Sequence, residues 1–340
     1  MKHRILAAWK WPRQPAILAG VTFLLAFCPY TYGQQESGAA SGPKSSKLSI
    51  LPVQGDVYLI AGAGGNITVQ VSRDAVVVVN TGLAGMTPEV MAAIRSISTK
   101  PILYVVNTSA DPDLTGGNQA ISRMGLAITG RIVSGAAILE DAGSSALILA
   151  HENVLNKLSA PVGGTRATPS GAWPTDTFLA GTEMLNGEAI QVFHEPAAHT
   201  DGDSIVWFRK SDVISAGRLF SAVSYPIIDL ESHGSINGFI AGLNHILDIA
   251  VPGFAEEGGT YIVPNEGRIG DEADVVDYRD MVVIIRDRIQ DMIKRKMTLA
   301  QVKSARPTVD FDPRYGAAAG PASTDAFVEA VYKDLSKAKQ

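Results

Sequence analysis

The chain has 340 residues, of which 46% are hydrophobic and 19% charged, a composition typical of a globular protein with a sizeable core. Its net charge of −5 argues against nucleic acid as a partner, because phosphates must be neutralised by Lys and Arg. Cys28 is the only cysteine, so the chain can form no internal disulfide.

Residues 1–33 have the features of an export signal. A basic leader is followed by 13 largely apolar residues (15–27), too few to span a bilayer comfortably, and Gly33 ends a possible cleavage site. Cleavage would remove four basic residues and no acidic ones, which changes the net charge from −5 to −9 and leaves no cysteine. We therefore expect a periplasmic or extracellular protein. An uncleaved membrane anchor is the alternative, and no other contact with a membrane is expected.

Residues 34–48 are rich in Ser, Gly and Ala, which predicts a flexible linker. Short β-branched runs then predict three strands, at 57–60, 67–71 and 75–79, and the glycines between the first two mark a turn. Thr87-Pro88-Glu89 has the form of a helix start, with Thr87 as the cap and the helix ending near Ser98.

The elements that follow alternate between strand and helix. The apolar patterns predict a strand at 102–106, a helix at 117–124, a strand at 126–129, a helical stretch at 136–158, strands near 178 and at 190–194, 205–208 and 213–215, a helix at 236–249 and a strand at 261–264. Two sheets flanked by helices, an α/β fold of the αββα sandwich type, fit this order for residues 49–270. Residues 271–340 are expected to form a helical C-terminal extension, with helices at 278–296, after Thr298 and at 324–338.

Polar motifs follow several of these strands. The segment from Asn107 to Asn118 reads NTSADPDLTGGN, and it resembles the loop Thr-His-x-His-x-Asp-His-x-Gly-Gly-Asn of the metallo-β-lactamase superfamily. Further segments match that family in the same order: Val76 to Gly82, His194 to Ser204, Gly217-Arg218 and Val263 to Gly267. The resemblance covers roughly residues 50–270 and implies the fold of the family.

The resemblance also implies two zinc sites that activate a water molecule to hydrolyse an ester, thioester, lactone or lactam. Seven positions of this chain correspond to the zinc ligands. The first zinc would take Ser109, Asp111 and His199, the second Asp113, Leu114 and Glu266, and the ligand that bridges the two would be Arg218. Only Asp113 and His199 keep the residue of the family.

These substitutions predict that zinc is lost and that no cofactor is present. Serine is a poor zinc ligand, Leu114 has no donor atom, and the permanently protonated Arg218 has no lone pair to offer a metal ion. We expect the Arg218 guanidinium to replace the charge of the metal and to pair with at least one of Asp111, Asp113 and Glu266. The resulting prediction is a non-catalytic homologue, a pseudoenzyme, that binds a small molecule or a protein partner in the retained cleft.

Three alternatives stay open. The charged residues could be a purely structural cluster that fills an abandoned cavity. The chain could be a hydrolase with an altered metal site, in which zinc or another divalent cation binds Asp111, Asp113, His199 and Glu266. Finally, Ser109, His199 and Asp111 could form a metal-free nucleophilic set, with Arg218 as oxyanion donor. No other catalytic residue is indicated.

The remaining histidines give weaker signals. We expect His151 to be a packing residue within a helix, His194 to hydrogen-bond locally and His245 to lie on a helix surface. His233 is expected in a loop near the mouth of the cleft.

Overall fold

The computed structural model describes residues 48–125, 145–162, 165–166, 168–253 and 258–337. They belong to one compact unit, Ser46–Gln340. The predicted export signal, nearly all of the predicted linker and the predicted strand at 126–129 lie outside the described residues.

The first sheet contains seven strands. They lie in the order β1 (Ser49–Pro52), β2 (Val57–Ala63), β3 (Gly65–Val71), β4 (Val76–Val79), β5 (Ile102–Val106), β6 (Leu147–His151) and β9 (Asp176–Phe178). The strands from β1 to β4 pair antiparallel, whereas β4, β5, β6 and β9 run parallel. All four valines of β4 are buried, as expected for a strand that is covered on both faces.

The second sheet contains five strands. They lie in the order β10 (Gly181–Leu185), β11 (Ala189–His194), β12 (Ser204–Phe208), β13 (Val213–Ser215) and β14 (Tyr261–Val263). All neighbours pair antiparallel except β13 and β14, which are parallel. A separate ribbon joins β7 (Pro161–Val162) to β8 (Thr165–Arg166).

Nine α-helices and three short 3₁₀ turns accompany the sheets within the described ranges. The helices are α1 (Thr87–Ile97), α2 (Pro112–Thr115), α3 (Asn118–Ser122), α4 (Glu152–Ser159), α5 (Ile236–Ile249), α6 (Glu272–Lys294), α7 (Leu299–Ala305), α8 (Asp312–Tyr315) and α9 (Thr324–Lys337). The 3₁₀ turns are η1 (Ala84–Met86), η2 (Ser170–Ala172) and η3 (Gly217–Leu219). None of the helices in this part of the chain is long and apolar enough to cross a membrane.

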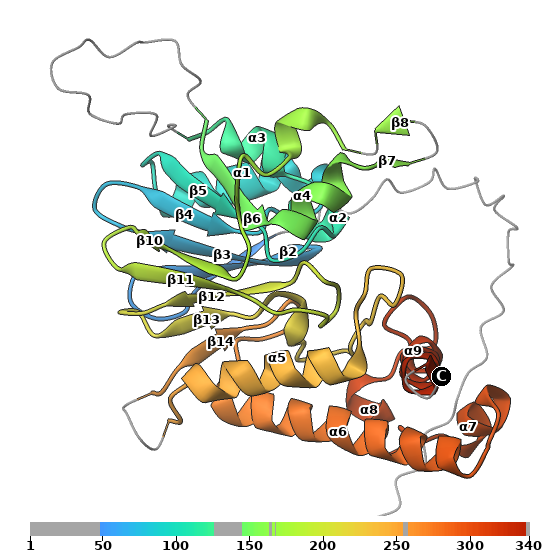
Figure 1. Cartoon of the computed structure of the whole chain (residues 1–340). Coiled ribbons are helices and arrows are strands. Elements are labelled where there is room, and N and C mark those ends of the chain that lie inside the picture. Colours follow the sequence, from blue (N-terminus) through green and yellow to red (C-terminus); the bar gives the residue numbers. More distant parts are fainter. Residues whose placement is uncertain (1–47, 126–144, 163–164, 167, 254–257, 338–340) are drawn as a thin grey trace, which may run out of the picture. The chain divides into compact units, whose positions relative to one another are not determined.

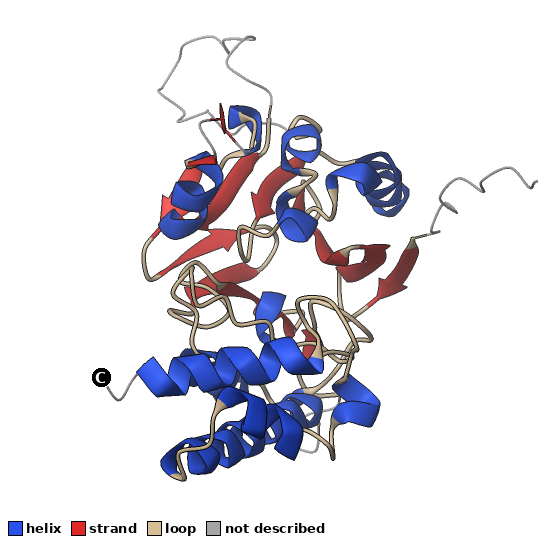
Figure 2. Cartoon of the chain, turned by 90° about the vertical axis from the view of Figure 1, so that its right-hand side faces the viewer, coloured by secondary structure: helices blue, strands red, loops and turns tan. Residues whose placement is uncertain are grey.

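The two sheets lie face to face between helices, which confirms an αββα sandwich (Figures 1 and 2), and buried side chains fill the spaces between these layers. One cluster, which includes Val79 and Val206, lies between the two sheets. A second, which includes Val78 and Ile94, joins the first sheet to α1 and α3. A third joins the second sheet to α5, α6 and α9.

The helices after residue 270 share this third cluster with the second sheet. Tyr225 stacks on Phe327 of α9 with ring centroids 5.1 Å apart, and Tyr278 of α6 meets Phe220 edge-on at 5.4 Å. The Tyr225 hydroxyl also donates to the Thr308 carbonyl at 3.2 Å. The C-terminal helices therefore complete a core that the sandwich begins.

Two sequence predictions were wrong in element type or start. Residues 147–151, predicted as part of a helix, form the parallel strand β6, because a short strand buried on both faces has a continuous apolar run that resembles a buried helix. Helix α6 begins at Glu272 instead of 278, after a capping box in which Asp271 and Asp274 bond reciprocally.

The cap predicted for α1 was also wrong. Thr87 is the first residue of the helix, and its hydroxyl donates to the Ala84 carbonyl at 2.9 Å, so it caps no helical N–H group. Strand β1, the ribbon β7–β8 and strand β10 were not predicted. The exposed residues of β1 and the glycine that begins β10 explain why these short edge strands gave weak patterns.

Candidate active-site cleft

The seven residues singled out by the sequence lie in four segments that follow strands. Residues 107–118 follow β5, His199 lies between β11 and β12, Arg218 lies in η3 after β13, and Glu266 follows β14. These segments meet at one end of the two sheets. Functional groups commonly lie on the loops that follow the ends of strands.

Buried amides hold the long loop after β5 in place. Asn80, at the end of β4 with a φ of 64°, accepts hydrogen bonds from the Thr108 amide at 3.0 Å and the Thr108 hydroxyl at 3.1 Å. Asn107 and Asn118 exchange two amide hydrogen bonds, of 3.0 and 2.8 Å. The loop is therefore fixed at both ends, which limits the positions that Asp111 and Asp113 can take.

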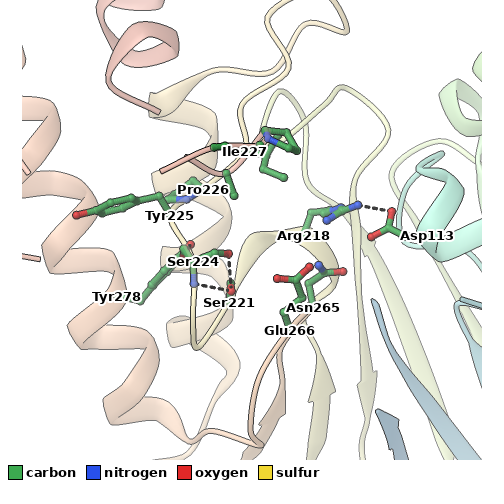
Figure 3. A pocket seen from close by; sticks show the side chains of 14 residues that line it. Asp113, Arg218, Ser221, Ser224, Tyr225, Pro226, Ile227, Asn265, Glu266 and Tyr278 are labelled. Atoms are coloured by element: carbon green, nitrogen blue, oxygen red, sulfur yellow. Dashed lines mark hydrogen bonds and ion pairs between the residues drawn. The ribbon is translucent and has the colours of Figure 1, made fainter. Parts of the chain in front are cut away.

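Asp111 is the centre of the cluster. Its Oδ2 atom accepts hydrogen bonds from the Ser109 hydroxyl at 2.7 Å, from His199 Nε2 at 3.0 Å and from Arg218 Nε at 3.0 Å. Arg218 also donates from Nη2 to Asp113 Oδ1 (Figure 3). One guanidinium thus connects two carboxylates that the sequence assigned to two different metal sites.

The cluster is largely shielded from solvent. Side-chain exposure is 4% for His199, 11% for Arg218 and about one fifth for the two aspartates. Burial lowers the pKa of Arg218, but the carboxylates of Asp111 and Asp113 outweigh it and raise that pKa above its usual value. Burial raises the pKa of Asp111, but the hydrogen bond and charge of His199 and the charge of Arg218 hold it well below its usual range.

His199 is held as a cation. Its Nε2 faces the Asp111 carboxylate and its Nδ1 lies 2.8 Å from the Ile227 carbonyl, so both ring nitrogens must donate. Burial lowers the pKa of His199, but the hydrogen bond to Asp111 and the charges of Asp203 and Asp111 outweigh it and raise the pKa. Asp203 is itself fully buried, and burial raises its pKa to about 6.

This arrangement predicts how the contribution of His199 to stability depends on pH. The pKa of folded His199 lies above its ordinary 6.5, so the stabilisation is complete below pH 6.5 and is lost as the pH rises through the folded pKa. The contribution of Asp111 is present above pH 3.8 and falls away below it. In urea unfolding, His199→Asn should lower the free energy of unfolding most between pH 3.8 and pH 6.5, and less at pH 9. A cost that grows with rising pH would contradict a cationic His199.

Two of the seven positions that the family resemblance matched to zinc ligands lie outside the network. Leu114 is fully buried, and a Cβ added to Gly65 would lie 2.5 Å from Leu114 Cδ2, which shows how closely the side chain packs against that glycine. Glu266 forms no hydrogen bond or ion pair through its carboxylate with any described residue. Burial raises its pKa, although the charge of Arg218 acts in the opposite direction.

A cavity of about 360 Å³ opens beside Arg218 (Figure 3). Its lining includes Asp113, Glu266 and Asn265 from the sandwich and residues 319–322 from the segment between α8 and α9. These lining residues belong to a stretch rich in Gly and Ala, residues 316–323. Small residues carry no periodic signal, so their place in the wall could not be predicted.

Among the described histidines, His151, His194, His233 and His245 do not line this cavity. His151 is the last residue of β6 and caps α4, where its Nδ1 accepts from the Asn153 amide, so its predicted place inside a helix was wrong. Its ring stacks on His194 at 3.6 Å, and His194 Nε2 bonds the Asp201 carbonyl locally. His245, partly exposed on α5, bonds the buried Glu195 through Nδ1 at 2.5 Å, a pair that the sequence did not indicate.

Comparison with known proteins gives matches among structures alone: no family model and no curated protein sequence matches the chain. The DIM-1 metallo-β-lactamase shares 16% identity and superposes with a TM-score of 0.52 over 70% of this chain and 98% of its own. A metallo-β-lactamase from Pontibacter korlensis shares 14% identity, with a TM-score of 0.52 over 69% and 99% of the two chains. This chain has the metallo-β-lactamase fold.

A second kind of metallo-β-lactamase-fold protein matches more of the chain. A double mutant of the sec-alkyl sulfatase PisA1 shares 13% identity and superposes with a TM-score of 0.56 over 84% of this chain, which corresponds to half of the sulfatase. The likeness in fold to the sulfatase therefore extends over most of this chain.

The side chains present do not fit the pair of zinc ions that the family resemblance implies. Within the described ranges there is no group of three or more His, Cys, Asp or Glu side chains placed to hold a metal ion. Leu114 has no atom that can bind a metal. His199 Nε2, the atom that would bind one, carries a proton and donates it to Asp111. Arg218 donates to the same aspartates that would bind a cation.

Proposed function

We propose that this protein is a non-catalytic member of the metallo-β-lactamase fold that binds a small molecule in the cavity beside Arg218 and uses no metal. The observation that carries the proposal is the guanidinium of Arg218, which donates to both Asp111 and Asp113. A permanent positive charge in this position supplies the compensation that buried carboxylates otherwise take from a metal ion.

The electrostatics argue against metal and guanidinium together. Two unit charges 4 Å apart repel by about 4 kcal/mol at an effective dielectric constant near 20, and a dication doubles that value. A zinc ion would also have to displace Arg218 from Asp111 and Asp113, which would leave the guanidinium, only 11% exposed, without its partners. The energetic cost of loading zinc is therefore high.

The geometry also gives little support to a metal-free nucleophile. A serine nucleophile needs a base that accepts its proton, but the Ser109 hydroxyl donates to Asp111, not to His199. Among the described residues no hydrogen bond joins Ser109 to His199, and the Ser109 side chain is fully buried. Asp111 lies between the two, which is the wrong order for proton relay from serine to histidine.

The cavity supports a binding role. Its volume of about 360 Å³ lies within the range of about 300–1,000 Å³ found for small-molecule sites. Its wall combines apolar residues, such as Pro226, Ile227 and Pro321, with a few polar side chains that could orient a ligand. A small molecule is preferred over a protein partner because the site is a concave cavity.

Metal analysis of the purified protein tests the proposal. We expect far less than one zinc, iron or manganese per chain, and no rise in melting temperature when zinc is added, because a ligand that binds the native state must stabilise it. Near-stoichiometric metal, together with hydrolysis of an ester, thioester, lactone or lactam that is lost in both Asp113→Ala and His199→Ala, would overturn it. Glu89→Ala, at an exposed position on α1, is the control for nonspecific loss of activity.

We also propose that the protein is exported. The support is the basic and then apolar sequence of residues 1–33. N-terminal sequencing of the protein recovered outside the cytoplasm should begin near Gln34, and an intact Met1 in that fraction would favour the uncleaved anchor.

A further inference from the structure

Two histidine rings from different sheets are stacked on each other. His151 is the last residue of β6 in the first sheet, and His194 is the last residue of β11 in the second (Figure 1). The ring centroids lie 3.6 Å apart, and the ring planes are inclined by only 11°. The pair lies outside both the cavity beside Arg218 and the hydrogen-bond network of Asp111, so the proposed function does not use it.

Two backbone contacts fix the protonation state of His151. Its Nε2 lies 2.8 Å from the Leu179 carbonyl oxygen, which can only accept, so Nε2 donates. Its Nδ1 accepts a hydrogen bond from the Asn153 amide at 3.2 Å and thereby caps the N-terminus of α4. A ring that donates from one nitrogen and accepts at the other is neutral. A proton on Nδ1 would therefore face the Asn153 N–H group and remove the cap.

The groups around His151 act on this proton in opposite directions. Burial and then the neighbouring His194 ring lower the pKa of His151. Three groups on the adjoining segments act the other way: the Leu179 carbonyl and the carboxylates of Glu152 and Asp201. Their effect is the smaller one, and the pKa of His151 lies below its ordinary 6.5. His151 is therefore neutral at neutral pH and takes up a proton only in acid.

On the other side of the stack, the charged neighbour of His194 is Glu195. The Glu195 carboxylate is already bonded to His245 Nδ1 of α5 at 2.5 Å. His194 Nε2 donates to the Asp201 carbonyl, which is a neutral acceptor. Among the described residues, neither ring of the stack is bonded to a carboxylate. Two protonated rings would therefore repel each other across 3.6 Å with no bonded carboxylate to offset the repulsion.

The first turn of α4 packs against the turn between β11 and β12. Asn153 Nδ2 donates to the Asp201 carbonyl at 3.0 Å, and the same oxygen accepts from His194 Nε2 at 2.9 Å. A Cβ added to Gly202 would lie only 3.1 Å from Val154 Cγ2. The cap of α4 and its contact with this turn are therefore formed by the same few residues.

We infer that the stack of His151 and His194 is an acid-sensitive switch: a proton on His151 uncaps α4 and loosens its contact with the segment between β11 and β12, which carries His199. The proton goes to Nδ1, the ring nitrogen that has a lone pair. The unfolded chain binds this proton more readily, so the local stability of α4 is complete above pH 6.5 and is lost as the pH falls below that value. The inference goes beyond the proposed function and holds whether or not the cavity binds a ligand.

Hydrogen exchange of the full chain, followed by mass spectrometry, tests the inference. Exchange rates are compared with those of unstructured peptides at the same pH, which gives a protection factor for each segment. Between pH 7.5 and pH 5 the protection of α4 should fall about fivefold or more, as expected when a helix loses its cap, while that of α1 should stay unchanged. Equal protection of α4 at the two pH values would overturn the inference. An equal fall in α1 would do the same, because the whole fold would then be responding to acid.

Two matched substitutions locate the effect. His151→Asn keeps an oxygen that can accept from the Asn153 amide, because asparagine is among the best N-caps, but it cannot take up a proton. In this variant α4 should be equally protected at pH 7.5 and pH 5. His233→Asn makes the same change at an exposed position with a φ of 60°, a conformation that asparagine tolerates, and should keep the response of the wild type. A wild-type response in His151→Asn would show that a different group takes up the proton and would overturn the inference.

A titration of the wild-type protein followed by NMR needs no variant. The His151 ring should titrate with a midpoint below pH 6.5, and the amide signal of Asn153 should move with the same midpoint, since the two groups share a hydrogen bond. A midpoint above pH 6.5, or an Asn153 signal that does not follow the ring, would contradict the switch. None of these measurements depends on metal content or ligand binding, so their failure would leave the proposed function untouched.

Discussion

Replacing Arg218 with methionine is expected to lower the free energy of unfolding by about 3–5 kcal/mol at neutral pH. The substitution keeps much of the apolar stem but removes the guanidinium that bonds both Asp111 and Asp113. It therefore leaves Asp113 without a cationic partner and Asp111 with His199 alone. Urea unfolding followed by circular dichroism measures the change.

A matched control separates this loss from that of an ordinary surface ion pair. Arg295→Met breaks the pair with Asp291 on α6, where both side chains are about 60% exposed, and should cost about 0.3–0.5 kcal/mol. Adding Asp113→Asn to Arg218→Met should recover part of the stability, because it removes the carboxylate that has lost its cation. If Arg218→Met is no more destabilising than Arg295→Met, the guanidinium is not the charge on which the cluster depends.

Ending the chain after Gly270 is expected to abolish cooperative folding. The truncation removes α6 to α9, and with them Tyr278, Ile285 and Phe327, which share one buried cluster with the second sheet and α5. Losing so many buried side chains would exceed the whole stability of a typical domain, about 5–15 kcal/mol. Calorimetry should show no sharp unfolding transition for the shortened chain.

A single substitution tests the same packing in a chain of full length. Phe327→Ala should cost about 3–5 kcal/mol, because it leaves a cavity against the Tyr225 ring. Val309→Ala, at a position 44% exposed in the same C-terminal region, should change stability by less than about 0.5 kcal/mol. A shortened chain that unfolds cooperatively would show that the predicted boundary at 270/271 separates two independent folding units.

The sequence predicted the layers of the fold because its strongest signals were local. The four valines of β4 and the helical spacing of apolar residues in α5 mark the positions that are buried. The spacing of buried positions indicates whether a segment is a strand or a helix. The polar motifs followed predicted strands, and the contact of Arg218 with Asp111 and Asp113 agrees with the expectation drawn from the family resemblance together with charge. Strand β6 was missed because its apolar run could equally have been helical.

The finer features of the cleft depend on contacts that no local pattern encodes. The protonated state of the His199 ring depends on the Ile227 carbonyl, which lies 28 residues further along the chain. Glu266 was expected to be one of several possible partners of Arg218, but the guanidinium donates to the two aspartates instead. The contribution of residues 319–322 to the wall depends on how α8 and α9 pack, and a stretch of alanine, glycine and proline gives no sign of it.

The ion pairs at Arg218 join residues that lie 105 and 107 positions apart in the chain. Because such contacts close a long stretch of chain, we expect them to form late in folding and to add little to the stability of the transition state. The network should therefore slow unfolding. Without Arg218 the native state would have a shorter lifetime, while the refolding rate would stay nearly the same.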